Sequence, residues 1–542
     1  MFKKTKIAAA TIALLSAAAA QNVSAVAFDE SGNKAQVLIF PYYNTNNGFL
    51  TGFNIRNTSN DTKAVKVRFR ESKLSNDVLD FNVYLSPWDR FSMSVSVNGA
   101  GQAAITTPDK TCTFPAIVGS KAFKGNVYKN TSDADAREGY LEVIEMGVIN
   151  PNTVIAKDTT ALKIANGAKI VDGIKHAAAT NAPVDCSVIK DAWDAGTFTE
   201  GGANAVVNGV NDTTRIAANI TTPTGGLQGW SFLLDIANGN AFVANPAAIR
   251  NYQTSNGDAQ RRTAQHYKSD TPATFLLPSL ASGNVITTEV LNDIGNNTAY
   301  PNNWATAVDY ASTLQGQAEI AYVNSGSTPP TASGINPYPI SALLAATGLT
   351  NDYLLDATTN VGTDWVITFP MRKHGIYPNV TYSPAATVAA PVFANPVDGN
   401  VKFTTTVYNS EEQKVANLTD DFSPVASAPF DLLPREVNIL SFGKTGDSTV
   451  SKVLNSANTK NLGVSFNDGW AELAFTLNKT ANVLSAAAVS SDPINTGITF
   501  NGIPAIGFAA IHGNVTTVPG AKTVTIGETV PHAFVRSRPA VN

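Results

Sequence analysis

The sequence has little charge and little of the chemistry that charge, sulfur and imidazole bring. Charged residues make up 15% of its 542 residues, and it holds 2 cysteines, 5 histidines and 4 methionines. A globular chain ordinarily has about a quarter of its residues charged. The formal net charge is −4. This mild acidity excludes the basic field that a nucleic-acid partner requires.

Motifs for catalysis and for cofactors are missing as well. The histidines are scattered and include no His-Glu-x-x-His pair, so a zinc or copper site is not indicated. There is no Gly-x-Ser-x-Gly elbow, no P-loop, no glycine-rich dinucleotide fingerprint and no Cys-x-x-Cys-His haem motif. We therefore predict a protein that is not an enzyme, with no catalytic residue, no cofactor and no metal ligand set.

The acidic residues leave two alternatives open. Glu142 and Glu145 are three residues apart on one expected strand, which sends them to opposite faces and makes them poor catalytic partners. One alternative is a secreted hydrolase whose catalytic acids come together only when the chain folds. Calcium favours oxygen-rich loops, and Asp133-Ala-Asp135 with Glu138 is the best local candidate for that ion.

Long hydrophobic runs are also absent. The apolar run from Ile7 to Ala20 has 14 residues, fewer than the roughly 20 of a membrane helix. It follows three lysines and precedes small residues, a pattern typical of a secretory signal peptide. We predict a signal peptide over residues 1–25, with cleavage before Val26 or at the nearby Ala25-Val26-Ala27 site. We expect an exported protein of the extracellular cell surface without a transmembrane segment.

The two cysteines, Cys112 and Cys186, lie 74 residues apart in the first half of the chain. In an oxidising compartment two such cysteines usually pair, and neither has a flanking base that would activate a thiol nucleophile. We predict a Cys112–Cys186 disulfide, which would stabilise the fold by about 4 kcal/mol through loop closure.

Alternation of apolar and polar residues predicts antiparallel β-strands. The clearest example is 64–70, where Val65, Val67 and Phe69 share one face. Further strands are expected at 37–43, 49–56, 79–85, 91–97, 139–146, 226–236 and 241–245 in the first half, and at 365–369, 401–407, 436–442, 471–477 and 522–526 in the second. Short strands with polar turns, each with one apolar face, are typical of a β-sandwich.

The chain divides into two such units. We predict a mainly β protein made of two antiparallel Ig-like β-sandwich units with a helical or irregular insertion. The first β-sandwich domain covers 26–250, with the insertion near 156–200. The polar, strand-poor stretch after residue 250 marks the boundary. The second domain covers 251–542 and holds a short helix near 340–347.

Two surface features allow more than one interpretation. Lys66, Arg68 and Arg70 form a cationic row that we interpret as the solvent-exposed face of a sheet, with Asp80 and Asn82 as cross-strand partners. Binding of an anionic polymer is the alternative. The six tryptophans could form a sugar-stacking platform, but Trp365 lies in an apolar strand and Trp470 opens one, which predicts core packing for both. The six are Trp88, Trp193, Trp230, Trp304, Trp365 and Trp470.

Several segments, in order along most of the chain, are similar to a family of exported, mostly uncharacterised proteobacterial cell-surface, or surface-layer-like, proteins. The segments are Leu38-Ile-Phe-Pro-Tyr-Tyr-Asn44, Lys63-Ala-Val-Lys-Val-Arg-Phe-Arg-Glu71, Val78-Leu-Asp-Phe-Asn-Val-Tyr-Leu-Ser-Pro-Trp88, Glu138-Gly-Tyr-Leu-Glu-Val-Ile-Glu-Met-Gly147, Gly362-Thr-Asp-Trp-Val-Ile-Thr-Phe-Pro370, Gly469-Trp-Ala-Glu-Leu473 and Gly502-Ile-Pro-Ala-Ile-Gly-Phe-Ala509. The resemblance implies a surface protein, in some members one that forms the outer protein array, and it carries no catalytic residues.

Together these observations favour a structural protein of the bacterial outer cell surface that self-assembles into a surface layer or another homo-oligomer. Low charge favours broad side contacts between copies, because electrostatic self-repulsion is small. The alternative is a secreted adhesin or glycan-binding protein that recognises surface polysaccharide through exposed aromatic residues.

Overall fold

A computed structural model describes most of the chain in segments. They are residues 27–125, 131–153, 169–194, 219–236, 239–250, 252, 280, 340, 343–356, 361–372, 401–416, 431–444, 451, 453–476, 483–485, 499–515 and 524–536. The predicted signal peptide, residues 1–25, lies outside them, as does most of the predicted boundary region after residue 250.

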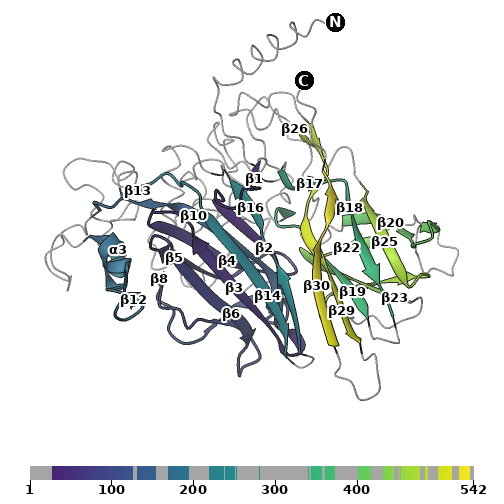
Figure 1. The fold of residues 1–542 in the computed structure, drawn as a ribbon, viewed down its shortest axis with the longest axis horizontal. Helices are drawn as coiled ribbons and strands as arrows, with labels where there is room; N and C mark the ends of the chain where they lie inside the picture. The colour runs from purple at the N-terminus through teal and green to yellow at the C-terminus, as the bar shows by residue number, and fades with distance from the viewer. Residues whose placement is uncertain are drawn as a thin grey trace, which may run out of the picture.

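Two sheets are built from the first half of the chain (Figure 1). Sheet 1 runs, in spatial order, β1 (Ala27–Phe28), β16 (Ala247–Arg250), β2 (Val37–Asn44), β10 (Glu138–Ile149), β4 (Lys63–Glu71), β5 (Asp77–Leu85) and β8 (Thr113–Phe114), with β13 (Ile220–Thr221) paired to β10. Sheet 2 runs β15 (Asn240–Ala244), β14 (Leu227–Asp235), β3 (Phe49–Asn57), β6 (Arg90–Val97), β7 (Ala103–Thr106) and β9 (Lys121–Ala122). The pairings within both are antiparallel.

Two further sheets come from the second half. Sheet 3 runs β21 (Lys414–Ala416), β20 (Val401–Tyr408), β25 (Asp468–Phe475), β18 (Gly348–Leu354) and β31 (Ala533–Val535), with β22 (Asp431–Leu433) paired to β20. Sheet 4 runs β24 (Thr459–Val464), β23 (Val437–Lys444), β19 (Gly362–Thr368), β29 (Ile506–Val515) and β30 (Val524–Pro531). Within these sheets β23 and β24 are parallel and the other pairings are antiparallel. The prediction of a mainly β protein with several antiparallel sheets is confirmed.

Short elements complete the described fold. Within the predicted insertion near 156–200 they are helices α2 (Ile170–Ile174) and α3 (Ser187–Asp194) and the ribbon of β11 (His176–Ala177) with β12 (Ala182–Pro183). Two other ribbons are β17 (Ala345–Ala346) with β28 (Ile503–Pro504), and β26 (Val483–Ser485) with β27 (Thr499–Asn501). The 3-10 turns include η1 (Asn46–Gly48) and η3 (Asp135–Arg137). Because β17 pairs as a strand, the helix expected over 340–347 does not extend through its last residues.

The apolar faces of sheets 1 and 2 enclose one hydrophobic core. Val65, Val67 and Phe69 of β4 project into it, as their alternation predicts, and Phe53 of β3 meets them from sheet 2. The Phe53 and Phe69 rings make an edge-to-face contact with centroids 5.7 Å apart. A second core lies between sheets 3 and 4, where Tyr353 and Phe442 stack at 5.0 Å.

A third hydrophobic cluster joins the two halves. It combines side chains of sheets 1 and 2, such as Ile39 and Phe242, with side chains of sheet 4, such as Val366, Ile439 and Phe508, all buried. Figure 1 shows β29 and β30, in yellow, beside the strands of the first half. Burial of apolar side chains contributed by both halves stabilises the junction by roughly 25 cal/mol for each Å² removed from water. The four sheets are therefore parts of one packed body.

Candidate functional site

The cationic row of sheet 1 is buried, which corrects the prediction of a solvent-exposed face. Lys66 and Arg70 are fully buried and Arg68 is almost so. The predicted cross-strand partner is correct, since Lys66 Nζ lies 3.0 Å from Asp80 Oδ2. Arg70 Nε lies 2.9 Å from Glu142 Oε1 on β10. The row is thus occupied by neighbouring carboxylates and is not open to an anionic polymer.

The buried ion pairs cross three strands of sheet 1. Arg68 Nε lies 2.9 Å from Asp77 Oδ2 of β5, and Lys63 Nζ of β4 lies 2.7 Å from Glu145 Oε1 of β10. Burial lowers the pKa of Lys66, against the opposing effect of Asp80. Burial raises the pKa of Glu145, although Lys63 acts the other way. Removing one member of such a pair leaves an uncompensated buried charge, so this network is structural.

The proposed calcium ligands do not converge on one site. Asp135 accepts from Arg435 Nη1 at 3.0 Å, across the junction between the halves. Asp133 accepts from Gln102 Nε2 at 3.0 Å. Glu138 is buried and accepts from Ser456 Oγ at 2.7 Å and from the backbone of residue 457 at 2.8 Å. Over the described residues, no three His, Cys, Asp or Glu side chains gather as a metal site requires.

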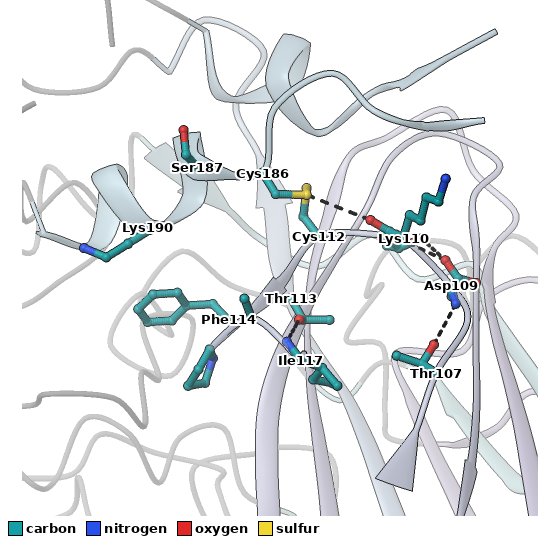
Figure 2. A pocket seen from close by; sticks show the side chains of 13 residues that line it. Thr107, Asp109, Lys110, Cys112, Thr113, Phe114, Ile117, Cys186, Ser187 and Lys190 are labelled. Atoms are coloured by element: carbon teal, nitrogen blue, oxygen red, sulfur yellow. Dashed lines mark hydrogen bonds between the residues drawn. A yellow bond between two sulfur atoms is a disulfide. The ribbon is translucent and has the colours of Figure 1, made fainter. Parts of the chain in front are cut away.

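The predicted disulfide joins Cys112, beside β8, to Cys186, just before α3. A cleft of about 630 Å³ opens beside it, between the 107–117 segment and the start of α3 (Figure 2). Its lining includes two ammonium groups, those of Lys110 and Lys190. Figure 2 shows these side chains pointing in different directions, on opposite sides of the disulfide. They do not converge on one bound anion, and Asp109, the carboxylate of the lining, accepts from the backbone N–H groups of Ser92 and Thr111.

The tryptophans divide between the core and the surface. Trp365 is fully buried, which confirms the prediction of core packing. Trp470 is 40% exposed, so the same prediction is wrong for this residue. Trp88, at 68% exposed, lies in a turn, and Trp230 is half-buried. The side chain of Trp193 and all of Trp304 lie outside the described residues.

The exposed Trp470 forms an aromatic pair with the half-buried Tyr408. They are directly opposite each other on the antiparallel strands β25 and β20. Their rings are stacked, with centroids 4.0 Å apart and planes 10° from parallel. The strands alternate strictly, so Ala471 and Leu473 point into the core while Trp470 points out of sheet 3. We call Trp470 and Tyr408 the aromatic platform.

Glycine at position 469 permits this close pairing. Its φ of +144° lies in a region that favours glycine, and a Cβ there would meet the Tyr408 carbonyl oxygen at 1.9 Å. Any side chain at 469 would therefore push β25 away from β20 next to the two rings. Beneath the platform, the buried Trp365 donates its Nε1–H to the Asp352 carbonyl at 3.1 Å, which ties β19 to β18. This hydrogen bond holds β18, the strand beside Trp470, against the core.

Polar side chains surround the platform on the outer face of sheet 3. Asp352 of β18 is the cross-strand neighbour of Trp470, on the side away from Tyr408. Glu472 follows Trp470 by two residues on the same face, and Thr350 is opposite Glu472. An aromatic face bordered by hydrogen-bonding groups suits a ligand that is apolar on one side and rich in hydroxyls at its edge.

No family model, no curated protein and no solved structure matches the chain. Within the described segments, no helix combines the length and apolar character needed to cross a membrane. The arrangement of side chains is therefore the basis for assigning a function. Three features were candidate binding sites. The carboxylates of β5 and β10 occupy the cationic row, and the lysines of the cleft beside the disulfide point in different directions. The aromatic platform is exposed to solvent at Trp470.

Proposed function

We propose that the chain is a structural, non-enzymatic protein of the bacterial outer cell surface that self-associates into a surface layer. The observation that carries this proposal is the junction between its halves, where sheets 1, 2 and 4 share one hydrophobic cluster. A subunit that tiles a surface must keep a constant shape from copy to copy, and a packed junction gives it one.

Polar contacts add to the stiffness of that junction. Asn44 Nδ2 donates to the Leu454 carbonyl at 2.6 Å, and Thr368 Oγ1 donates to the Pro41 carbonyl at 2.6 Å. The buried carboxylate of Glu138 on β10 binds the 456–457 turn of the other half. Because these groups are buried, breaking them without replacement would leave unsatisfied polar atoms. The two halves therefore move as a unit.

The finer architecture belongs to the same proposal. Each pair of facing sheets is an Ig-like sandwich unit, the first within 26–250 with a helical insertion near 156–200, the second within 251–542. The signal-like residues 1–25 direct export, and the Cys112–Cys186 disulfide suits the oxidising space outside the cytoplasm. Calcium would bridge acidic turns of neighbouring copies.

Electron microscopy of the purified whole chain tests self-association. The protein is concentrated on a lipid or carbon support, with calcium in one sample and a chelator in the other. Ordered two-dimensional arrays in either sample support the proposal, and arrays only with calcium assign a bridging role to the ion. Monodisperse particles at every concentration in both samples would contradict it.

A second candidate function, an adhesin or glycan-binding protein, is favoured by one observation. Trp470 is 40% exposed and lies stacked on Tyr408 with polar groups around it. An exposed tryptophan with its ring held in place offers a large, rigid contact area at low entropic cost. The two functions are compatible, because a layer subunit needs an attachment to the cell envelope.

A further inference from the structure

We propose that the aromatic platform, Trp470 with Tyr408, is a binding subsite for a neutral polysaccharide. The inference rests on the second proposed function and names its site and its ligand class. The ligand is a chain of uncharged hexose or pentose units that presents the apolar face of one sugar ring to Trp470.

One face of the Trp470 ring is available to a ligand. Neighbouring strands lie about 4.8 Å apart, and the two rings are stacked with centroids 4.0 Å apart. They therefore stand up from sheet 3, each covering one face of the other. Because β25 lies between β20 and β18, Tyr408 covers the β20 side of Trp470. The opposite face of the indole is turned toward β18.

Hydrogen-bonding groups lie on the side where that free face is turned. Asp352, the β18 partner of Trp470, is exposed and short, so it borders the free face without filling the space above the strand. Thr350 and Glu472 form the next cross-strand row and are half-buried. Carboxylates accept hydrogen bonds from vicinal hydroxyls, and a threonine hydroxyl both donates and accepts. A sugar ring stacked on Trp470 would place its hydroxyl edge over these groups.

The charge around the platform selects against acidic glycans. On β18, β20, β21, β25 and the 409–413 turn, carboxylates outnumber ammonium groups. The acidic side chains are Asp352, Glu411, Glu412, Asp468 and Glu472, and the basic ones are Lys402 and Lys414. Lys414 is the β21 neighbour of Tyr408, on the side away from Trp470, whereas Asp352 borders the free face of the indole. Asp468 also accepts from Ser410 Oγ at 2.6 Å, which holds the neighbouring turn in place. A uronic-acid polymer would meet this excess of like charge, whereas a neutral chain would not.

The size of the site fits a chain and not a single sugar. One indole face matches one sugar ring, and an isolated stacking contact of this kind is weak. Leu354, 40% exposed, follows Asp352 on the outer face of β18 and extends the apolar surface along the strand. Neighbouring units of the same glycan would contact Leu354 on one side and Thr350 on the other. We therefore expect hexasaccharides to bind more tightly than disaccharides.

Isothermal titration calorimetry of the whole chain tests the inference. The probes are cellohexaose, mannohexaose and xylohexaose as neutral chains, and hexagalacturonate as the acidic one. We expect at least one neutral hexasaccharide to bind, and hexagalacturonate to bind more weakly. Trp470→Ala should lose about tenfold or more in affinity, because the stacking face is gone. Asp352→Asn should lose about threefold, since a charged acceptor is replaced by a neutral one.

Matched variants keep the test specific. Tyr408→Ala frees the Trp470 ring and should weaken binding, whereas Tyr408→Phe retains the stacked ring and should bind more tightly than Tyr408→Ala. Trp88→Asn removes an exposed tryptophan elsewhere, and asparagine tolerates the positive φ of 64° at that position. This variant should bind unchanged. Thermal unfolding of each variant confirms that the fold is intact.

The possible results distinguish the platform from the glycan-binding function on which it rests and from the surface-layer function. If a neutral hexasaccharide binds but Trp470→Ala binds equally well, the platform is refuted while a glycan-binding function stands. If no hexasaccharide binds, both the platform and the glycan-binding function fall. If hexagalacturonate binds best, the inference of a neutral ligand is refuted while a glycan-binding function stands. If Trp470→Ala abolishes ordered arrays, the platform is a contact between copies of the chain, and the inference is wrong.

Discussion

Acid should destabilise the second half of the molecule through one buried histidine. His532 is only 7% exposed. In the neutral form its Nε2–H donates to the Val366 carbonyl at 3.0 Å, and its Nδ1 accepts from the Asn351 amide at 2.8 Å. A second proton would have to sit on Nδ1, facing a donor. Burial lowers the pKa of His532 from 6.5 to about 3.

The sign and size of the effect follow from this difference in pKa. The unfolded chain protonates this imidazole below about pH 6.5, whereas the folded chain does so only near pH 3. The stability that the neutral imidazole contributes is therefore complete above pH 6.5 and is lost as the pH falls toward 3. The free energy of unfolding should fall by about 1.4 kcal/mol per pH unit in this window, or by roughly 2.7 kcal/mol between pH 6.5 and 4.5.

Comparison with His532→Gln isolates this contribution. Glutamine offers a donor and an acceptor but does not titrate. Other groups act on both proteins alike, including Glu71, Glu138 and Glu145, whose pKa values are raised by burial. For those carboxylates the effect of pH on stability has the opposite sign. The folded state binds their protons at a higher pH than the unfolded state does, so it gains stability as the pH falls through the raised pKa values.

The assay is urea unfolding followed by tryptophan fluorescence between pH 7 and pH 4.5. At pH 7 the variant should be less stable, because the ring contact with Trp365, at 5.2 Å, is lost. The deficit should shrink by about 1.4 kcal/mol for each pH unit below 6.5. Asn351→Asp places an acceptor opposite Nδ1 and should flatten the acid response of the wild type. Parallel pH profiles for wild type and His532→Gln would refute the reasoning.

Three further perturbations have defined outcomes. Arg70→Ala leaves the buried Glu142 with only its longer ion pair to Arg68 Nη1, at 3.6 Å, and should cost about 3 kcal/mol in urea unfolding. The double variant Arg70→Met, Glu142→Leu should cost less than the two single changes combined, and a loss below about 1 kcal/mol for Arg70→Ala would contradict the buried network. Reduction of the Cys112–Cys186 disulfide, or its replacement by alanines, should lower the free energy of unfolding by about 4 kcal/mol, because the bridge spans 74 residues. An unchanged melting temperature in reductant would show that the bridge does not stabilise the fold. Gly469→Ala should lower the free energy of unfolding by about 2–3 kcal/mol and disturb the aromatic platform, which a shift of the tryptophan emission would report. Emission and stability equal to those of the wild type would mean that the pairing of β20 with β25 does not require glycine at this position.

Alternation within single strands could be interpreted correctly from the sequence, but the environment of the second face could not. The pattern at 64–70 correctly placed Val65, Val67 and Phe69 in the core. It could not show that Lys66 and its neighbours on the other face are also buried. That depends on carboxylates from β5 and β10, which neutralise the row only once the strands are in register.

The aromatic platform shows the same limit. Alternation with Ala471 and Leu473 would have placed Trp470 on the outer face, but the apolar character of the strand led to the prediction of core packing. The pairing with Tyr408 depends on the register between β20 and β25, strands separated by about 60 residues of sequence. A tryptophan one residue out of phase with a core-facing run was the signal that would have identified it.

The disulfide was predictable because the sequence holds only 2 cysteines. The junction between the halves was not, because its contacts join residues as distant as Asn44 and Leu454. No local pattern specifies which outer faces of two β-units meet. Packing of the whole chain decides that, through apolar residues that would otherwise remain exposed.

Cryo-electron tomography of the producing cells, compared with cells that lack this gene, tests the central claim most directly. The account predicts a periodic layer on the outer surface of wild-type cells that disappears in the deletion and returns when the gene is restored. An outer envelope that looks the same with and without the gene would contradict a structural role in a surface layer.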